Sequence, residues 1–254
     1  MEALNDWISN IEKKLTTFVL SLDFAKAFDS MSRPKLIYKL EYLGIYGNVL
    51  SCIKSFLDDR MQRVKIGNCF STYQPIISGV PQGSVLGPLL FVIFINDITD
   101  ASSNGNNIKL FADDLKSYIS GRDLGCKEIF ISSIAELLEW AQLWQLPIAF
   151  KKSSWGVIGR GKEAAADFSL GDEKLDKVSE VNDLGVKFNY KLEFSAHIDE
   201  TISKAKQRLF LLNKSFVSKD PQIFIKGYKT YDLLILDYNS QTWSPYNAGD
   251  ISRV

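Results

Sequence analysis

Three aspartates carry the clearest chemical signal in this sequence. Asp113 and Asp114 are adjacent in the stretch Phe111-Ala112-Asp113-Asp114, and apolar runs on both sides predict two short strands joined by a tight turn. Acidic residues are rare in strands and costly when half buried, so a multivalent cation is the natural compensation. By itself, a pair of aspartates at a hairpin tip is more often a plain solvated turn, because Asp favours turns through local hydrogen bonds.

The third aspartate, Asp23, lies in matching surroundings. It follows the apolar run Phe18-Val19-Leu20-Ser21-Leu22, which predicts a buried strand with Asp23 at its carboxyl end. Three carboxylates with no nearby Cys or His suit Mg²⁺ or Mn²⁺ and not zinc. Two such ions, roughly 3.5–4 Å apart, would activate an attacking hydroxyl and stabilise a leaving pyrophosphate. The alternative for Asp23 is a helix cap, a role for which Asp29, ahead of Arg33-Pro34, is the better candidate.

A loop rich in glycine and proline lies between the two acidic sites. It reads Ser78-Gly79-Val80-Pro81-Gln82-Gly83-Ser84-Val85-Leu86-Gly87-Pro88 and leads into an almost wholly apolar segment. Glycine lets the backbone approach a ligand closely, and proline restricts the chain. A rigid turn before a buried core helix is the alternative. Beside a metal site, we expect this loop to position a substrate.

Three segments resemble, in order and spacing, motifs A, B and C of reverse transcriptases: Leu22–Asp29, Ser78–Pro88 and Phe111–Asp114. The residues in these motifs most resemble those of non-LTR (LINE-like) retrotransposons of the jockey type. A further segment, Glu139–Lys152, looks like motif D of that family. The agreement of several motifs in order and spacing is more specific evidence for the family than a single pair of aspartates.

The resemblance covers nearly the whole chain, because Asp183–Val186 and residues 236–246 are similar to later segments of the family, the second being its post-thumb signature. It implies an α+β fold: a polymerase right-hand palm, with a ferredoxin-like antiparallel sheet and helices, plus partial fingers and a helical thumb. Residues 1–190 would form the palm with partial fingers at about 34–77. Residues 191–254 would form the thumb-like helical region and the start of the post-thumb segment.

The resemblance also implies roles for the acidic residues. Asp23 and Asp113 would be the principal ligands of two Mg²⁺ or Mn²⁺ ions, with Asp114 in the site and less directly coordinating. Phe24 would lend its carbonyl to the second ion. Lys152 aligns with the motif D lysine that would protonate pyrophosphate as it leaves, a role that suits a mobile proton and a positive charge.

Other residues would bind the substrate. Phe28 looks like the steric gate that excludes a 2′-hydroxyl and so favours deoxynucleotides; a core aromatic is the alternative. The substrate-binding residues that the resemblance implies are Phe28, Gln82, Gly83, Phe111 and Ala112.

The resemblance implies an RNA-directed DNA polymerase in which a primer 3′-hydroxyl attacks the α-phosphate of a dNTP. Its partners would be an RNA template, a DNA primer, dNTPs and other parts of a retrotransposon polyprotein. The alternative is a truncated, catalytically inactive element-derived protein that folds and at most binds nucleic acid. An RNA-dependent RNA polymerase also uses paired aspartates, but Phe28 at the gate position disfavours it.

Departures from the family pattern bear on these expectations. Ala149, Ser153 and Asp183 replace the usual Asn, Cys and Tyr, away from the metal site. Little sequence precedes Asp23, where complete enzymes carry the fingers hairpin that binds the triphosphate. We therefore expect most of the N-terminal fingers to be lacking and the nucleotide pocket to be incomplete.

Composition predicts a folded intracellular protein of the cytoplasm or nucleus. The chain has 254 residues, is 46% hydrophobic, and carries 30 basic and 30 acidic residues. It shows no signal peptide, and its apolar runs are too short to span a bilayer, so we expect no membrane partner. Cys52, Cys69 and Cys126 are widely spaced and are expected to be reduced, buried thiols.

An amphipathic helix is expected at 196–216. It would direct Lys204, Arg208 and Lys214 to solvent, where they could lie along a phosphate backbone or form an ordinary solvated face. The residues expected to point inward are Ile198, Ile202, Ala205, Leu209 and Leu212. His197 is the only histidine and is expected to be structural.

The remaining elements follow from periodicity and breakers. Helices are expected at 2–14, 33–43, 47–58, 87–96 and 124–144. Strands are expected at 17–23, 61–67 and 70–77, around Asp113, and in short pieces to about residue 190, with an exposed loop at 159–172 and a helical tail.

Overall fold

The computed structural model describes residues 2–101, 105–122, 125–159, 168–170, 173–216 and 220–253. Contacts group the chain into two units. The larger unit comprises Lys14–Val157 and Gly161–Lys177, and the smaller comprises Met1–Lys13, Ile158–Arg160 and Val178–Val254. The division expected from the sequence near residue 190 stays a prediction.

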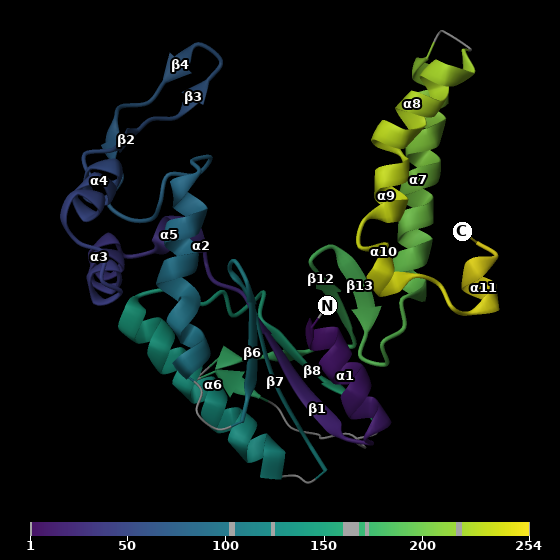
Figure 1. Cartoon of the computed structure of the whole chain (residues 1–254), viewed down its shortest axis with the longest axis horizontal. Coiled ribbons are helices and arrows are strands. Elements are labelled where there is room, and N and C mark those ends of the chain that lie inside the picture. Colours follow the sequence, from purple (N-terminus) through teal and green to yellow (C-terminus); the bar gives the residue numbers. More distant parts are fainter. Residues whose placement is uncertain are drawn as a thin grey trace. The chain divides into compact units, whose positions relative to one another are not determined.

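A sheet with strand order β11-β8-β1-β7-β6 organises the larger unit (Figure 1). Its strands are β1 (Thr16–Leu22), β6 (Asn107–Phe111), β7 (Asp114–Gly121), β8 (Ser154–Ile158) and β11 (Asp176–Lys177). The order β8-β1-β7-β6, with helices after β1 and β7, is that of a ferredoxin-like core. The α+β palm expected from the sequence is therefore confirmed, and the parallel pairing of β11 with β8 makes the sheet mixed.

The central strand β1 is buried because its sequence is rich in β-branched and aromatic residues, which suit a strand covered on both faces. It pairs antiparallel with β7 over its full length, from Thr16 opposite Gly121 to Leu22 opposite Leu115. Helix α6 (Gly125–Trp144) packs on this pair, with the ring of Phe130 centred 6.0 Å from that of Phe18. Both rings are buried, so this contact belongs to the main core.

The other helices of the larger unit lie between β1 and β6 in sequence. They are α2 (Ala27–Ser30), α3 (Arg33–Tyr42), α4 (Gly47–Leu57), α5 (Leu86–Ile95) and the 3₁₀ helix η1 (Asn96–Ala101). The short strands of this unit are β2 (Met61–Gln62), β3 (Lys65–Ile66), β4 (Cys69–Phe70), β5 (Gln74–Pro75), β9 (Ser169–Leu170) and β10 (Glu173–Lys174). Helices α3, α4 and α5 lie at the expected positions to within a few residues, whereas α2 and η1 were not expected. The two longer strands expected at 61–67 and 70–77 are instead two pairs of two-residue strands, β2 with β5 and β3 with β4.

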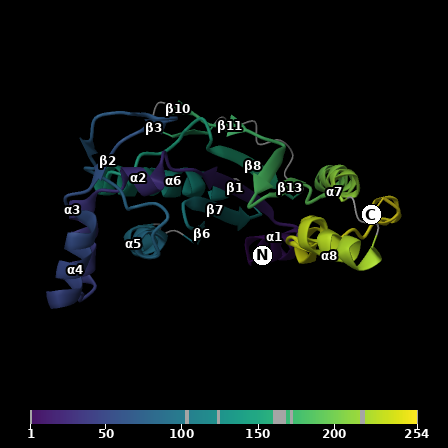
Figure 2. The same ribbon diagram turned by 90° about the horizontal axis from the view of Figure 1, so that it is seen from above.

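The smaller unit is mainly helical, as expected for a thumb. It contains α1 (Glu2–Glu12), β12 (Glu180–Asp183), β13 (Val186–Asn189), α7 (Ser195–Ser215), α8 (Pro221–Tyr231), α9 (Leu233–Asp237), α10 (Ser240–Trp243) and α11 (Ala248–Ile251). Helix α8 lies alongside α7 in both views (Figures 1 and 2). Asp220 begins α8 as its cap, because its carboxylate accepts a hydrogen bond of 2.9 Å from the Gln222 amide.

Several sequence expectations are wrong in detail. Cys52 and Cys69 are exposed and Cys126 is half buried, although all three are free thiols as expected. Leu209 is 37% exposed on α7 and does not point inward. Asp29 lies inside α2 and does not cap α3, which begins after Ser32. Much of the loop expected at 159–172 lies outside the described residues.

None of the helices in the described part of the chain is long and apolar enough to cross a membrane. Helix α5 is the most apolar, and it is short. Its buried side chains include Leu90, Phe91 and Phe94, so its apolar surface contributes to the protein core.

A buried lysine joins four helical elements of the larger unit, namely α3, α5, η1 and α6. Lys39 on α3 pairs with Asp97 of η1, and its ammonium lies over the rings of Phe94, Trp140 and Trp144, at 3.7 Å from the last. Burial lowers the pKa of Lys39 to about 8, and the hydrogen bond with Asp97 opposes this shift. The interaction is thus a desolvated cation held by one carboxylate and three aromatic faces.

The carboxylate should matter more than the ammonium. Asp97→Ala leaves Lys39 buried without its counter-ion and is expected to lower the free energy of unfolding by about 3 kcal/mol. Lys39→Met keeps the volume and leaves an Asp97 side chain that is 42% exposed, so the loss is expected to stay below about 1 kcal/mol. Urea denaturation of both variants measures the difference, and a larger loss for Lys39→Met would contradict this explanation.

Candidate active site

The register of β1 with β7 brings the predicted acidic residues to one edge of the sheet. The last pair is Leu22 with Leu115, and one further step places Asp23 opposite Asp114. Asp113 occupies the turn between β6 and β7, next to Ala112, whose φ is +53°. Asp23 and Asp113 are half buried and Asp114 is exposed. A strand end and a hairpin tip that are distant in sequence are therefore neighbours, as predicted.

The segment of Asp23 is fixed by backbone hydrogen bonds to the chain that follows α6. The Ala149 amide donates to the Asp23 carbonyl at 2.8 Å, and the Ala25 amide donates to the Pro147 carbonyl at 2.7 Å. Between them, Phe24 forms a β-bridge with Ile148. In an antiparallel pair of this kind the flanking residues make the ladder bonds, so the Phe24 carbonyl, a predicted metal ligand, is not used by the ladder.

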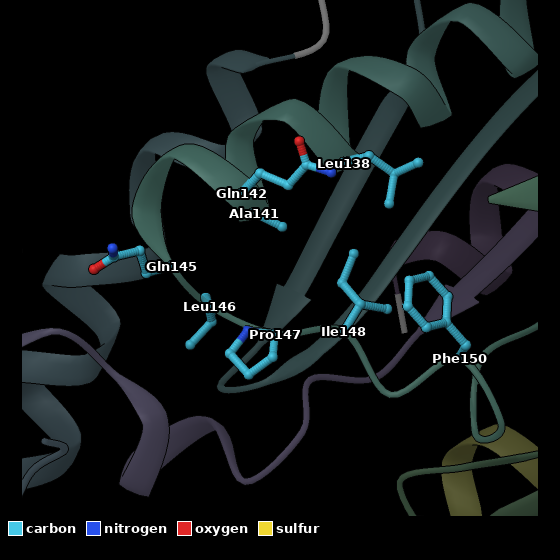
Figure 3. Close-up of a pocket in the computed structure, with 8 residues that line it drawn as sticks. All are labelled: Leu138, Ala141, Gln142, Gln145, Leu146, Pro147, Ile148 and Phe150. Carbon is cyan, nitrogen blue, oxygen red and sulfur yellow. The ribbon is translucent and has the colours of Figure 1, made fainter. Parts of the chain in front are cut away.

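A pocket of about 490 Å³ lies beside this supporting segment (Figure 3). Helix α6 contributes Leu138, Ala141, Gln142 and Gln145, and the chain after it contributes Leu146, Pro147, Ile148 and Phe150. None of the predicted site residues lines it. The pocket is mostly apolar and borders the segment that holds Asp23 in place.

Lys152, the predicted proton donor, reaches Asp23. Its Nζ lies 3.2 Å from Asp23 Oδ2, while 74% of its side chain is exposed. Asp23 Oδ2 is buried and makes no hydrogen bond, since the lysine is close enough for an ion pair but not aligned for a hydrogen bond. Most buried polar atoms take part in a hydrogen bond, so this oxygen keeps an acceptor position that a cation could use.

The carboxylates do not form a closed metal cluster. Among the described residues, no group of three or more His, Cys, Asp or Glu side chains is placed to hold a metal ion. The donor type nevertheless fits a hard cation, because the predicted ligands are all oxygen atoms, from three carboxylates and the Phe24 carbonyl. The ligand assignment of Asp23, Phe24, Asp113 and Asp114 stays a prediction.

The glycine-rich loop is docked on the segment that follows Asp23. The Gly79 amide donates to the Met31 carbonyl at 2.8 Å, and the Val80 amide donates to the Phe28 carbonyl at 2.9 Å. The Ser78 hydroxyl donates to the Asp29 carbonyl at 2.7 Å. These bonds join motifs A and B directly, so the loop is rigid on the side that faces motif A.

The predicted substrate-binding residues differ in their surroundings. Phe28 packs on Phe91, with ring centres 4.3 Å apart, so it is partly a core aromatic. Gln82 is exposed and donates to Asp29 Oδ1 at 2.7 Å. Gly83 has open space around it, and Phe111 is 64% exposed at the end of β6. The structure thus leaves Gln82, Gly83 and Phe111 accessible to a ligand.

The three cations predicted to bind nucleic acid are all exposed on α7, as expected. Lys204 pairs with Glu200 at 2.7 Å, and Lys187 pairs with the same carboxylate at 3.0 Å. Hydrogen bonds from Lys204 and Lys187 lower the pKa of Glu200 to about 2. Lys204 is therefore partly neutralised, whereas Arg208 and Lys214 form no ion pair with a carboxylate in the described segments. Their role stays a prediction.

His197 is structural, as expected. It is buried on α7, its Nδ1 accepts a hydrogen bond of 3.4 Å from the Lys187 amide, and its ring packs edge-on against Trp243 at 5.2 Å. Burial lowers its pKa, so the neutral imidazole is favoured.

Two supporting residues are missed by sequence reasoning. Arg33 is buried and donates to the carbonyls of Gly79 and Ile76, at 2.9 and 2.7 Å, so it clamps the glycine-rich loop. Ser153 is buried, and its hydroxyl accepts a hydrogen bond of 3.2 Å from the Asp23 amide, so the expectation that Ala149 and Ser153 lie away from the metal site is wrong: both contact the Asp23 backbone. In the sequence Arg33 reads only as the start of a helix, and nothing local marks its distant carbonyl partners.

A palm sheet with paired aspartates at a hairpin, a third aspartate just after the neighbouring strand and a docked glycine-rich loop is the arrangement of the palm in right-hand nucleic-acid polymerases. Residues 3–188 match the family described as "Reverse transcriptase (RNA-dependent DNA polymerase)". The chain belongs to this family, as a reverse transcriptase domain of the non-LTR retrotransposon type.

Similar proteins agree with this assignment. The chain is 28% identical over 184 residues to "RNA-directed DNA polymerase from mobile element jockey" of Drosophila melanogaster, covering 70% of this chain and 20% of that protein. It is 26% identical over 253 residues to "Probable RNA-directed DNA polymerase from transposon X-element" of the same fly, covering 92% of this chain and 26% of that protein. The chain thus spans between a fifth and about a quarter of these relatives.

A solved structure supports the fold. The apo telomerase of Candida tropicalis matches with a TM-score of 0.52 at 12% identity, covering 99% of this chain and 47% of that one. At this identity the likeness concerns the fold alone.

Two glycines of the loop should differ sharply in their tolerance of a side chain. Gly79 has φ +71°, and an added Cβ would lie 2.4 Å from the Phe28 carbonyl oxygen, so Gly79→Ala is expected to lower the free energy of unfolding by about 3 kcal/mol. Gly83 has φ +80° but no atom within 4 Å, so Gly83→Ala is expected to cost about 1 kcal/mol. Urea denaturation measures the free energy of unfolding of both variants. Equal losses for Gly79→Ala and Gly83→Ala would contradict the view that the close contact with Phe28 restricts residue 79.

Proposed function

We propose that this chain catalyses RNA-directed DNA synthesis: a primer 3′-hydroxyl attacks the α-phosphate of a dNTP and pyrophosphate leaves. The observation that carries the proposal is the register of β1 with β7, which brings Asp23 to the Asp113–Asp114 hairpin. Lys152 forms an ion pair with Asp23 at the same place. Family membership supports the reaction class. An RNA template, a DNA primer and dNTPs are the partners that this reaction needs.

Asp23 and Asp113 would hold two divalent cations, Mg²⁺ or Mn²⁺, with Asp114 beside them and the Phe24 carbonyl as a further oxygen ligand. When bound, such ions lower the pKa of an attacking hydroxyl and stabilise the charge on a leaving pyrophosphate. Carboxylate and carbonyl oxygens are the donors that these ions prefer. Asp23 Oδ2 supports this assignment, since it is buried and makes no hydrogen bond besides its ion pair with Lys152.

Lys152 would donate a proton from Nζ to the departing pyrophosphate. Its side chain is largely exposed and tethered only by an ion pair with Asp23, so it can move to an anionic ligand at small cost. A positioned ammonium also stabilises the charge that develops on the leaving group. Its pairing with Asp23 supports this role because it places Lys152 at the acidic edge of the sheet.

The glycine-rich loop and Phe28 would position the nucleotide. Gln82 and Gly83 would contact the incoming nucleotide and the template base, with Phe111 and Ala112 on the hairpin side. Phe28 is held by Phe91, which would make its ring a rigid barrier to a 2′-hydroxyl. Ribonucleotide incorporation by a Phe28→Val variant tests this selectivity.

Primer extension on poly(rA)/oligo(dT), with Mg²⁺ and then Mn²⁺, tests the proposed activity. Asp113→Asn removes the charge of one carboxylate with little change of shape, and is expected to lower extension by about 10³-fold or more. Asp176→Asn is the matched control, because Asp176 is an exposed aspartate on β11 outside the site. It should extend primers at the parent rate.

Extension that persists in Asp113→Asn would contradict the assigned role. No extension by a folded, monodisperse parent chain would overturn the proposed activity of this chain.

A further inference from the structure

The larger unit carries an extended arm that its core does not use. The arm comprises residues 60–76 and projects beyond α4 as the ribbon labelled β2, β3 and β4 (Figure 1). It begins where the Ile76 amide donates to the Arg60 carbonyl at 2.8 Å, and it ends at the turn between β3 and β4. None of its side chains belongs to the fully buried core.

The sequence makes this arm a regular hairpin. Gly67, at the first position of the tip, has φ +58°, as two-residue hairpin turns favour. Between the two short ladders, the Ser71 amide donates to the Val64 carbonyl at 2.9 Å, and the Val64 amide donates to the Ser71 hydroxyl at 2.9 Å. The arm is therefore held by its own hydrogen bonds.

The arm is exposed and positively charged. Every residue from 58 to 75 is exposed. Residues 60–77 contain Arg60, Arg63 and Lys65 and no acidic residue, although the whole chain has 30 charges of each sign. An arm with this charge favours an anionic partner.

Aromatic rings lie among these cations. The guanidinium carbon of Arg63 lies 4.0 Å from the ring centre of Phe70 and 4.8 Å from that of Tyr73. The Lys65 ammonium lies 5.3 Å from the Phe70 ring centre. Phe70 and Tyr73 are 49% and 56% exposed. The cations hold the rings in place and leave ring surface open.

We propose that this arm binds single-stranded nucleic acid, with Arg60, Arg63 and Lys65 on phosphates and Phe70 and Tyr73 stacked on bases. Exposed rings among cations bind single strands because unpaired bases offer faces for stacking, whereas bases in a duplex do not. Residues 60–77 carry three cations and no carboxylate, and this uniform positive charge matches a polyanion better than a protein surface of mixed charge. Identification of the strand as template rests on the proposed function; the binding itself does not.

Fluorescence anisotropy with a labelled single strand of about 12 nucleotides tests the proposal, since platforms of this kind cover about 4–16 nucleotides. RNA and DNA strands of equal sequence are compared, together with a duplex. EDTA is present throughout, so that binding is measured without the metal site or polymerisation. A failure of primer extension therefore leaves this result unaffected.

The charge variant is Arg63→Gln with Lys65→Gln in the full chain. It is expected to weaken single-strand binding about tenfold and to lower the slope of log K against log salt by about 1.4, because two phosphates would no longer be neutralised. Lys13→Gln with Lys14→Gln is the matched control, because these two lysines are also exposed and neighbouring. The control should bind the strand almost as tightly as the parent chain does.

The stacking variant is Tyr73→Leu, which keeps an apolar side chain and removes the ring. It is expected to weaken binding about fivefold or more with an unchanged salt slope. Circular dichroism and thermal melting verify that the variants fold, which the exposure of the arm favours.

Equal affinities of the arm and control variants would overturn the proposal, as would duplex binding as tight as single-strand binding. Light scattering that shows a dimer in the parent and a monomer in the arm variants, with no change in affinity, would make the arm an interface between two copies and would also overturn it.

Discussion

The antiparallel register of β1 with β7 sets the position of every acidic group in the proposed site. Side chains alternate between the two faces of a strand, so a slip of one residue would turn each of them to the opposite face. The pairing of Leu22 with Leu115 therefore also places Asp23 beside the hairpin that contains Asp113. The consecutive residues Phe18, Val19 and Leu20 are all buried, so β1 is packed on both faces where this register is set.

Backbone hydrogen bonds complete the site around that register. The chain after α6 pairs with the segment of Asp23, and the glycine-rich loop is docked on the segment that follows it. Arg33 clamps the loop from inside the protein through two carbonyls. Because main-chain groups and buried side chains do the positioning, the Asp114 carboxylate, Lys152, Gln82 and the Phe111 ring remain accessible to substrate.

The sequence predicts this site better than its supports. The motifs around Asp23, Gly79 and Asp113 are local patterns with strong turn and strand signals, so their elements lie where expected. The clamp of Arg33 and the pair of Lys39 with Asp97 join residues distant in sequence, and no local pattern marks them. The sequence also fails to predict the short strands of residues 60–76 and the exposure of Cys52. Both depend on which other elements pack over a segment, and the local sequence does not show this.

The central claim is that the strand end of Asp23 and the hairpin of Asp113 form one metal site. Replacing Mg²⁺ by Fe²⁺, with ascorbate and peroxide, cleaves the backbone next to a bound ion, and mass spectrometry locates the cuts. We predict cuts near residues 23–24 and 113–114, both suppressed by excess Mg²⁺ and both lost in Asp113→Asn. Cuts near only one of the two segments, or loss of only one set in the variant, would contradict a shared site.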